Sequence, residues 1–149
     1  MPEIVVGTNS YVSLEDADLY FGSRIFSEAW ADLSDDDKIL FLISAVKYLD
    51  HGFVWVGDKT LPDQPLEWPR LGEELVPTVF AEAQCEIALL LIQEGGDLRE
   101  TVKSLKLDKV DVTFGDTGIF PVLVINMLSG LGAVKSQTNS MVSVGVIRS

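Results

Sequence analysis

The segment from Pro77 to the Gly95-Gly96 pair constrains the fold more than any other part of the chain. Apolar residues recur on one side of it at helical spacing, namely Val79, Phe80, Ala83, Ile87, Leu90 and Leu91. Further apolar residues broaden this surface: Ala81, Ala88 and Leu89. A helix that is apolar on several sides needs neighbours on several sides. The pattern therefore predicts a surrounded central helix, with Pro77 at its first helical position and the glycines at its end.

Two helices are expected before the central one, because each has a start signal followed by an apolar stripe. Ser34 precedes Asp35-Asp36-Asp37, an arrangement typical of a helix N-cap with acidic residues in the first turn. The apolar stripe that follows is Ile39, Leu42, Ile43, Val46 and Leu49. Gly52 is predicted to end this helix. Ser13 with Asp16 resembles a capping box and predicts an earlier helix through Phe21, and residues 25–33 add a short helical or turn element.

After Asp97 the pattern changes to the period of two that is typical of strands. Leu105 and Leu107 alternate, and then Val110, Val112 and Phe114 alternate in the opposite phase, which indicates a bulge or turn between them. A last short helix is expected over residues 121–131. A short strand is also possible at residues 53–56, at the start of a long loop that reaches residue 76.

These elements predict a mainly α fold: a helical bundle with a small β element, strands or a hairpin, after the central helix, and an extended C-terminal tail. From Gly132 the chain is low in charge and rich in small polar residues. The domain boundary is therefore expected after residue 132, with residues 1–132 forming the helical domain and residues 133–149 forming the tail. A chain of 149 residues is long enough for one core of this kind.

Charge is distributed unevenly along the chain, whose formal net charge is -12 at pH 7. Residues 1–97 hold 19 Asp and Glu against 5 Lys and Arg, whereas residues 98–149 hold 4 against 6. A negative field repels phosphates, and sequence-independent DNA binding needs clustered Lys and Arg. Tight nucleic-acid binding is therefore disfavoured. The N-terminus lacks the basic and apolar regions of a secretory signal, so synthesis and folding in the cytoplasm are expected.

The sequence predicts a protein without catalysis and without a cofactor. His51, the single histidine, falls in the last turn of a predicted helix, where the helix dipole favours a positive charge. Cys85, the single cysteine, lies on the apolar side of the central helix and is expected in the core. The Asp35-Asp36-Asp37 run lacks the ligand spacing of a calcium loop. Gly95-Gly96 ends a helix instead of opening a phosphate-binding loop.

Two segments are candidates for contacts with other proteins. The first is a cluster of basic residues, Arg99, Lys103, Lys106 and Lys109. This cluster is either a solvated face or a contact for an acidic partner. Acidic residues dilute this run, and no aromatic rings are interleaved with it for base stacking. Strand-like alternation near the C-terminus could add to the sheet edge of a neighbouring protein. It consists of Val142, Val144, Val146 and Ile147.

The segment Gln64-Pro65-Leu66-Glu67-Trp68-Pro69-Arg70 is the most informative motif of the chain. Pro69 fixes its own φ and favours an extended backbone at Trp68, so the ring is held rigidly in a loop. One interpretation is that Trp68, Pro69 and Arg70 form an interface. The other is that Trp68 closes the core while Arg70 pairs with a nearby carboxylate.

This motif, with the segments around it, resembles a family of bacteriophage virion proteins. The matching segments are Tyr11-Val12-Ser13, Tyr20-Phe21, Trp30, the helix end at residues 45–50 and the helix after Pro77. The resemblance covers about residues 10–94. Members of this family are often labelled DnaT-like single-stranded-DNA-binding proteins, while they resemble the head-tail adaptor, or connector, subunits of long-tailed phages.

The resemblance implies a structural virion protein, a head-tail adaptor beneath the portal that extends the DNA channel. It would dock the next neck or tail protein, either a stopper or a tail terminator, and Val142, Val144, Val146 and Ile147 would contact the portal or a neighbouring subunit. It implies a closed homo-oligomeric ring of roughly twelve copies. Packaged double-stranded DNA would pass through without specific binding, and the protein would reside in the virion neck. The alternative is a single-stranded-DNA-binding protein of phage replication, which makes the opposite demand on charge.

Overall fold

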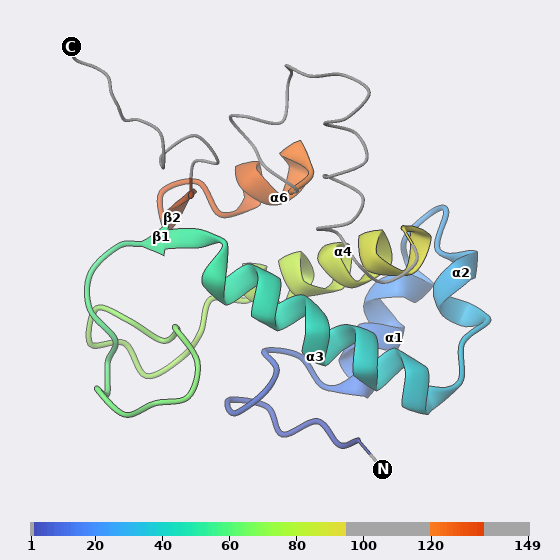
Figure 1. Ribbon diagram of the computed structural model, residues 1–149, viewed down its shortest axis with the longest axis horizontal. Coiled ribbons are helices and arrows are strands. Elements are labelled where there is room, and N and C mark those ends of the chain that lie inside the picture. The colour runs from blue at the N-terminus through green and yellow to red at the C-terminus, as the bar shows by residue number, and fades with distance from the viewer. Residues whose placement is uncertain (1, 95–119, 136–149) are drawn as a thin grey trace.

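The computed structural model describes residues 2–94 and 120–135. In this part of the chain four helices and one small antiparallel sheet surround a fifth helix, α4 (Val79–Gln93). Figure 1 shows α3 (Asp35–His51) along one side of α4, α1 (Leu14–Gly22) and α2 (Glu28–Ala31) at one end, and α6 (Val122–Met127) on the other side. The prediction of a mainly helical fold with a small β element is confirmed. None of the described helices is long and apolar enough to span a lipid bilayer.

The starts of α1 and α3 follow from local sequence. Ser13 Oγ accepts a hydrogen bond from Asp16 N at 3.1 Å, and Ser34 Oγ accepts one from Asp37 N at 3.2 Å. Each bond satisfies one of the amide donors that have no partner within the helix. Both predicted N-caps are therefore confirmed.

Gly52 ends α3 at the predicted position, but for a different reason. Its φ is -90°, so the left-handed conformation that usually selects glycine after a helix is not used here. A Cβ at this position would overlap the ring of Phe120 and lie 2.7 Å from the carbonyl oxygen of Tyr48. Glycine is required because the Phe120 ring packs directly against the backbone.

The start of α4 differs slightly from the prediction. Pro77 was expected at the first helical position, whereas the helix begins at Val79 after the N-cap Thr78. The amide of Phe80 donates to the carbonyl of Pro77 at 3.0 Å, and the amide of Ala81 donates to Thr78 at 3.1 Å. A tight turn therefore precedes regular helix, and proline supplies an acceptor to it. The burial of α4 on several sides is confirmed, because residues 83–89 are all buried.

The sheet joins distant parts of the chain. Strand β1 (Phe53–Trp55) pairs antiparallel with β2 (Gly132–Val134), with Phe53 opposite Val134 and Trp55 opposite Gly132. The amide of Lys135 then donates to the carbonyl of Gly52 at 2.9 Å. Residues 133–135, expected at the start of an extended tail, thus belong to the folded part. The strands expected at residues 105–114 lie outside the described residues, as does the remainder of the predicted tail.

Aromatic rings fill the core between α4 and the sheet. Phe80 of α4 contacts Tyr11, Trp55 and Trp68, with ring centroids 5.4, 5.2 and 4.9 Å away. Phe53 stacks on Trp55 at 4.9 Å. This cluster fixes the loop of residues 56–76 against the end of α3.

Candidate functional site

The motif at residues 64–70 is built into the core. Trp68 is 2% exposed and packs against Phe80 and edge-on to Trp55. Its indole nitrogen finds no hydrogen-bond partner among the described residues. Pro69 follows in a cis peptide bond and is half-buried. The ring is therefore occupied by packing inside the subunit.

Arg70 holds the loop to its own backbone. Its Nε donates to the carbonyl of Val56 at 2.9 Å, and its Nη1 donates to Oε1 of Glu67 at 2.8 Å. Lys59 lies 3.9 Å from the other oxygen of the same carboxylate. Of the two interpretations of this motif, the described contacts are those of a core tryptophan and a locally paired arginine.

A buried polar network joins this loop to the N-terminal segment and to α3. The hydroxyl of Tyr11 donates to Asp50 Oδ1 at 2.6 Å, and the amide of Glu67 donates to Asp50 Oδ2 at 3.1 Å. The amide of Trp68 donates to the Tyr11 hydroxyl oxygen at 3.3 Å. Burial raises the pKa of Asp50, an effect that its hydrogen bonds from Tyr11 and Glu67 oppose. Burial also raises the pKa of Tyr11.

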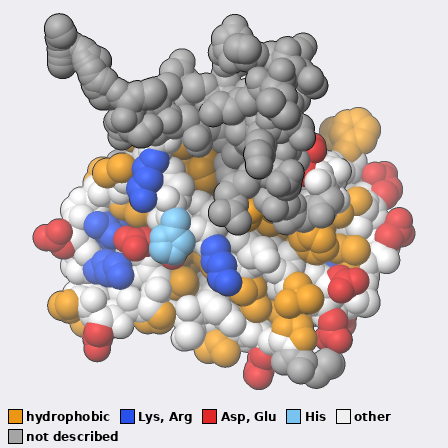
Figure 2. Space-filling model, in the orientation of Figure 1, with side chains coloured by type: hydrophobic (Ala, Val, Ile, Leu, Met, Phe, Trp, Pro, Cys, Tyr) orange, Lys and Arg blue, Asp and Glu red, His pale blue; other side chains and the backbone are white. Residues whose placement is uncertain are grey.

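Basic side chains gather next to this network. We define the basic face as Lys47 and His51 of α3, Lys59 and Arg70 of the loop, and Lys135 after β2. Lys47 and His51 are one helical turn apart and are both exposed, and Lys135 is exposed beside Gly52. Figure 2 shows the Lys, Arg and His side chains of this view in its left half, with a few Asp and Glu side chains among and around them, whereas more Asp and Glu side chains lie along the right edge.

The members of the basic face differ in their freedom to bind a ligand. Lys59 and Arg70 share Glu67, and the Arg70 side chain is only 11% exposed. Lys47 and Lys135 form no ion pair with any described residue. These two lysines, with Lys59 in part, are therefore the cations that can contact an anionic ligand.

A small hollow of about 170 Å³ adjoins the basic face. Lys47 and His51 line it together with the apolar residues Ile43, Val46 and Leu66. The aromatic residues that lie near the basic face in sequence are buried in the core, namely Phe53, Trp55 and Trp68. The face therefore offers cations and one imidazole to a ligand, which suits contacts to phosphates better than extensive stacking on bases.

The other candidate residues of the sequence are either parts of the fold or lie outside the described residues. Cys85 is fully buried, and burial raises the pKa of its thiol to about 12. The Asp35-Asp36-Asp37 run occupies the first turn of α3. Within residues 2–94 and 120–135 no three His, Cys, Asp or Glu side chains are grouped closely enough to hold a metal ion. The basic run at residues 99–109 and the alternating residues 142–147 lie outside the described residues.

The basic face is a site that the sequence analysis missed. Its residues are separated by up to 88 positions (47 to 135) and include only one local pair, Lys47 and His51. Helical spacing could have found that pair. The contribution of Lys135 depends on the pairing of β1 with β2, for which the sequence offers no local signal.

The comparisons with known proteins give one match. A family model described as "Putative DnaT-like ssDNA binding protein" matches residues 2–149. No curated protein and no solved structure matches the chain.

This match corrects the expected function. By this comparison the head-tail adaptor role is wrong, since the matching family is described by single-stranded DNA binding. The expectations that depended on that role are wrong with it: the connector ring beneath a portal, the neck or tail partners, and the passage of DNA without specific binding. The residues that suggested the adaptor explain the error in part. Trp68 and Arg70 make contacts inside the subunit, so the motif has a structural role that does not require an adaptor.

Proposed function

The chain belongs to the family of DnaT-like single-stranded-DNA-binding proteins, and on that premise we propose that it binds single-stranded DNA through the basic face. The contacts are to phosphates, so binding is independent of base sequence and sensitive to salt. The proposal contains no chemical step.

The observation that carries the proposal is the separation of charge along α3. Asp35, Asp36 and Asp37 occupy its first turn, whereas Lys47 and His51 lie in its last turns. A helix of 17 residues is about 25 Å long. The Debye length at physiological ionic strength is about 8 Å. Lys47 is 10 to 12 residues from these carboxylates, about 15 to 18 Å or roughly two Debye lengths, so most of their field is screened at Lys47. Local attraction of a phosphate chain is therefore compatible with the net charge of -12.

The cations of the basic face set the expected strength of binding. Lys47 and Lys135 give two phosphate contacts, and Lys59 adds a third if Glu67 releases it. At about -0.7 per contact, the slope of log affinity against log salt is then about -1.4 to -2.1. We therefore expect a weak interaction that is lost as the salt concentration rises.

The test uses substitutions at two lysines of the same helix. Lys47→Gln removes a cation from the basic face, and Lys38→Gln removes one from the acidic end, where Lys38 pairs with Asp18 at 3.1 Å. Both variants change the net charge equally. Fluorescence anisotropy of a labelled poly-dT oligonucleotide of about 20 nucleotides measures the affinity at low salt.

Lys47→Gln should weaken binding several-fold and make the salt slope shallower by about 0.7, because one phosphate contact is lost. Lys38→Gln should change the affinity less than about twofold. Adding Lys135→Gln to Lys47→Gln should reduce binding further. Equal effects of the two single variants would show that net charge alone controls binding, and the proposed face would be incorrect.

A further inference from the structure

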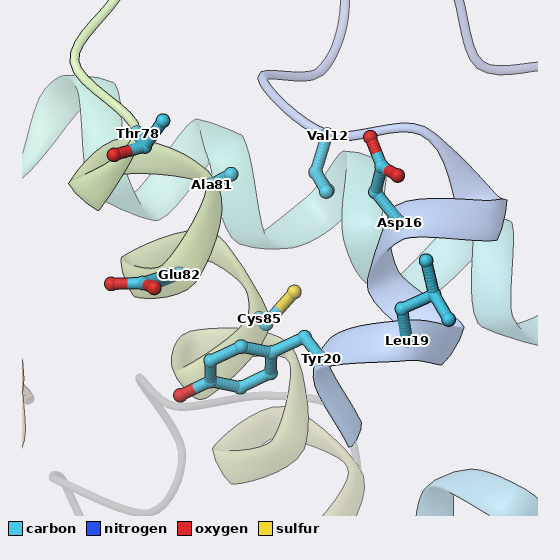
Figure 3. A pocket seen from close by; sticks show the side chains of 8 residues that line it. All are labelled: Val12, Asp16, Leu19, Tyr20, Thr78, Ala81, Glu82 and Cys85. Carbon is cyan, nitrogen blue, oxygen red and sulfur yellow. The ribbon is translucent and has the colours of Figure 1, made fainter. Parts of the chain in front are cut away.

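A hollow with an apolar floor lies between α1 and α4, at the end of the molecule that carries most of the negative charge. Its volume is about 340 Å³. Figure 3 shows Asp16 and Leu19 on α1 and, on α4, Ala81 and Cys85 pointing toward α1, whereas the carboxylate of Glu82 points away from α1. Val12 and Tyr20 complete the apolar part of the lining. This hollow shares no lining residue with the hollow beside the basic face, which is lined by the N-terminal segment, α3 and the loop before α4.

One wall of the hollow is fixed by a polar cluster. The hydroxyl of Tyr20 hydrogen-bonds to Glu86, and Arg24 forms a two-point contact with the same carboxylate, with Nε 2.7 Å from Oε2 and Nη2 2.9 Å from Oε1. Glu86 is 7% exposed, so its charge is compensated by Arg24 in a largely buried setting. The cluster holds the Tyr20 ring in place, and Arg24 is engaged by it. The shape of the hollow therefore exists before any partner arrives.

A second, shallower hollow adjoins the first on the other side of Leu19. It has a volume of about 500 Å³ and is lined by Leu14, Glu15, Asp18 and Leu19. Leu19 is 68% exposed and forms a ridge shared by the two hollows. Two recesses on either side of one ridge suit a helix that presents apolar side chains one turn apart.

The charges around the two hollows have one sign. Asp16 and Glu82 line the first hollow, Glu15 and Asp18 line the second, and neither lining contains Lys, Arg or His. Asp18 is engaged by Trp30 and Lys38, whereas Asp16, Glu15 and Glu82 form no ion pair with any described residue. A partner with cations beside its apolar side chains would complement this rim, and a nucleic acid would be repelled by it.

We propose that the surface formed by α1 and α4 around Leu19 docks a basic, amphipathic helical segment of a partner protein. Apolar side chains of that helix enter the two hollows, and its Lys or Arg side chains pair with Asp16, Glu82 and Glu15. This surface is acidic and the basic face is formed by other residues. The protein can therefore hold a basic polypeptide and a DNA strand at the same time. This inference does not depend on DNA binding.

The test uses a designed peptide as the probe, because the partner is defined only by its chemistry. The peptide repeats the heptad Leu-Lys-Lys-Leu-Leu-Lys-Lys three times and carries a fluorescent label, and its counterpart has Glu in place of every Lys. Anisotropy titrations with the full chain measure saturable binding. Amide NMR spectra report whether the signals of Leu19, Ala81 and Glu82 shift.

Two variants probe the apolar and the charged part of the surface. Leu19→Ser should weaken binding of the Lys peptide about tenfold, because an exposed leucine no longer becomes buried on docking. Asp16→Asn with Glu82→Gln should weaken it between about twofold and thirtyfold. The matched control, Asp58→Asn with Asp63→Asn in the loop before α4, removes the same charge and should change it less than about twofold.

The expected result is saturable binding of the Lys peptide, none of the Glu peptide, and losses confined to the α1 and α4 variants. Circular dichroism confirms that each variant is folded. The proposal is overturned if the Lys peptide does not bind, if Leu19→Ser leaves its affinity unchanged, or if the control pair loses as much affinity as the Asp16 and Glu82 pair.

Discussion

Removal of the Tyr11 hydroxyl tests the buried network that joins the N-terminal segment, α3 and the Trp68 loop. In Tyr11→Phe, Asp50 loses the donor that lies 2.6 Å from its Oδ1, and the amide of Trp68 loses its acceptor at 3.3 Å. Asp50 then keeps only the hydrogen bond from the Glu67 amide to its Oδ2, and the Trp68 amide is left without an acceptor in a buried position. An unsatisfied buried group costs about 1 to 3 kcal/mol, and more when it is charged. The expected loss of unfolding free energy at pH 7 is about 2 to 4 kcal/mol.

The cost of Tyr11→Phe should depend on pH. Burial raises the folded-state pKa of Asp50 above its ordinary value. The contribution of Asp50 to stability is therefore greatest at low pH, where the group is protonated in both states, and it declines as the pH rises through the folded pKa. The lost hydroxyl favoured the ionised form, so the variant raises this pKa further. The cost should consequently be largest at neutral pH and shrink as Asp50 becomes protonated.

Urea denaturation at pH 7 and near pH 4 measures both effects, and at pH 7 the midpoint should fall by about 1 to 2 M. The control is Tyr48→Phe, since the Tyr48 hydroxyl makes no hydrogen bond to any described residue. Its ring is half-buried on α3, the helix that also carries Asp50. That variant should cost less than about 0.5 kcal/mol. A cost below about 0.5 kcal/mol for Tyr11→Phe, or a cost independent of pH, would refute the reasoning.

Two further substitutions test the packing around the loop and the sheet. Trp68→Ala should lower the free energy of unfolding by about 3 to 5 kcal/mol in a denaturation experiment, because the ring is 2% exposed. The control Leu71→Ala in the same loop should lower it by less than about 1 kcal/mol, because that side chain is 57% exposed. Gly52→Ala should destabilise by about 1 to 3 kcal/mol through its overlap with Phe120, although Gly→Ala at a residue with φ of -90° normally stabilises. Combining it with Phe120→Leu should recover part of the loss, and a stabilising Gly52→Ala would show that the Phe120 ring does not occupy this position.

The sequence predicted those parts of the fold that depend on neighbouring residues. Ser13 and Ser34 act within one turn of their own helix, so their caps could be recognised from three or four positions. The apolar surface of α4 is likewise a local pattern. The hydrogen bond between Tyr11 and Asp50 joins residues 39 positions apart, and nothing near either residue indicates the other.

The candidate site was less accessible to sequence reasoning. Counting charges suggested that DNA binding was disfavoured, because a net charge of -12 averages over the whole chain. The fold separates the charges along α3, and only the folded arrangement brings Lys135 beside the last turn of that helix. The sequence indicates a rigid backbone at Trp68, and in the folded subunit this rigidity holds the ring in the core.

The most direct test of the central claim is a salt series of the affinity of the unmodified protein for single-stranded DNA. Anisotropy of a labelled poly-dT oligonucleotide is measured between about 50 and 200 mM salt. Two to three phosphate contacts predict saturable binding at the low end and a loss of affinity of about 7- to 20-fold across this range. No saturable binding at about 50 mM salt, or an affinity that does not change with salt, would contradict the claim that the basic face binds a phosphate chain.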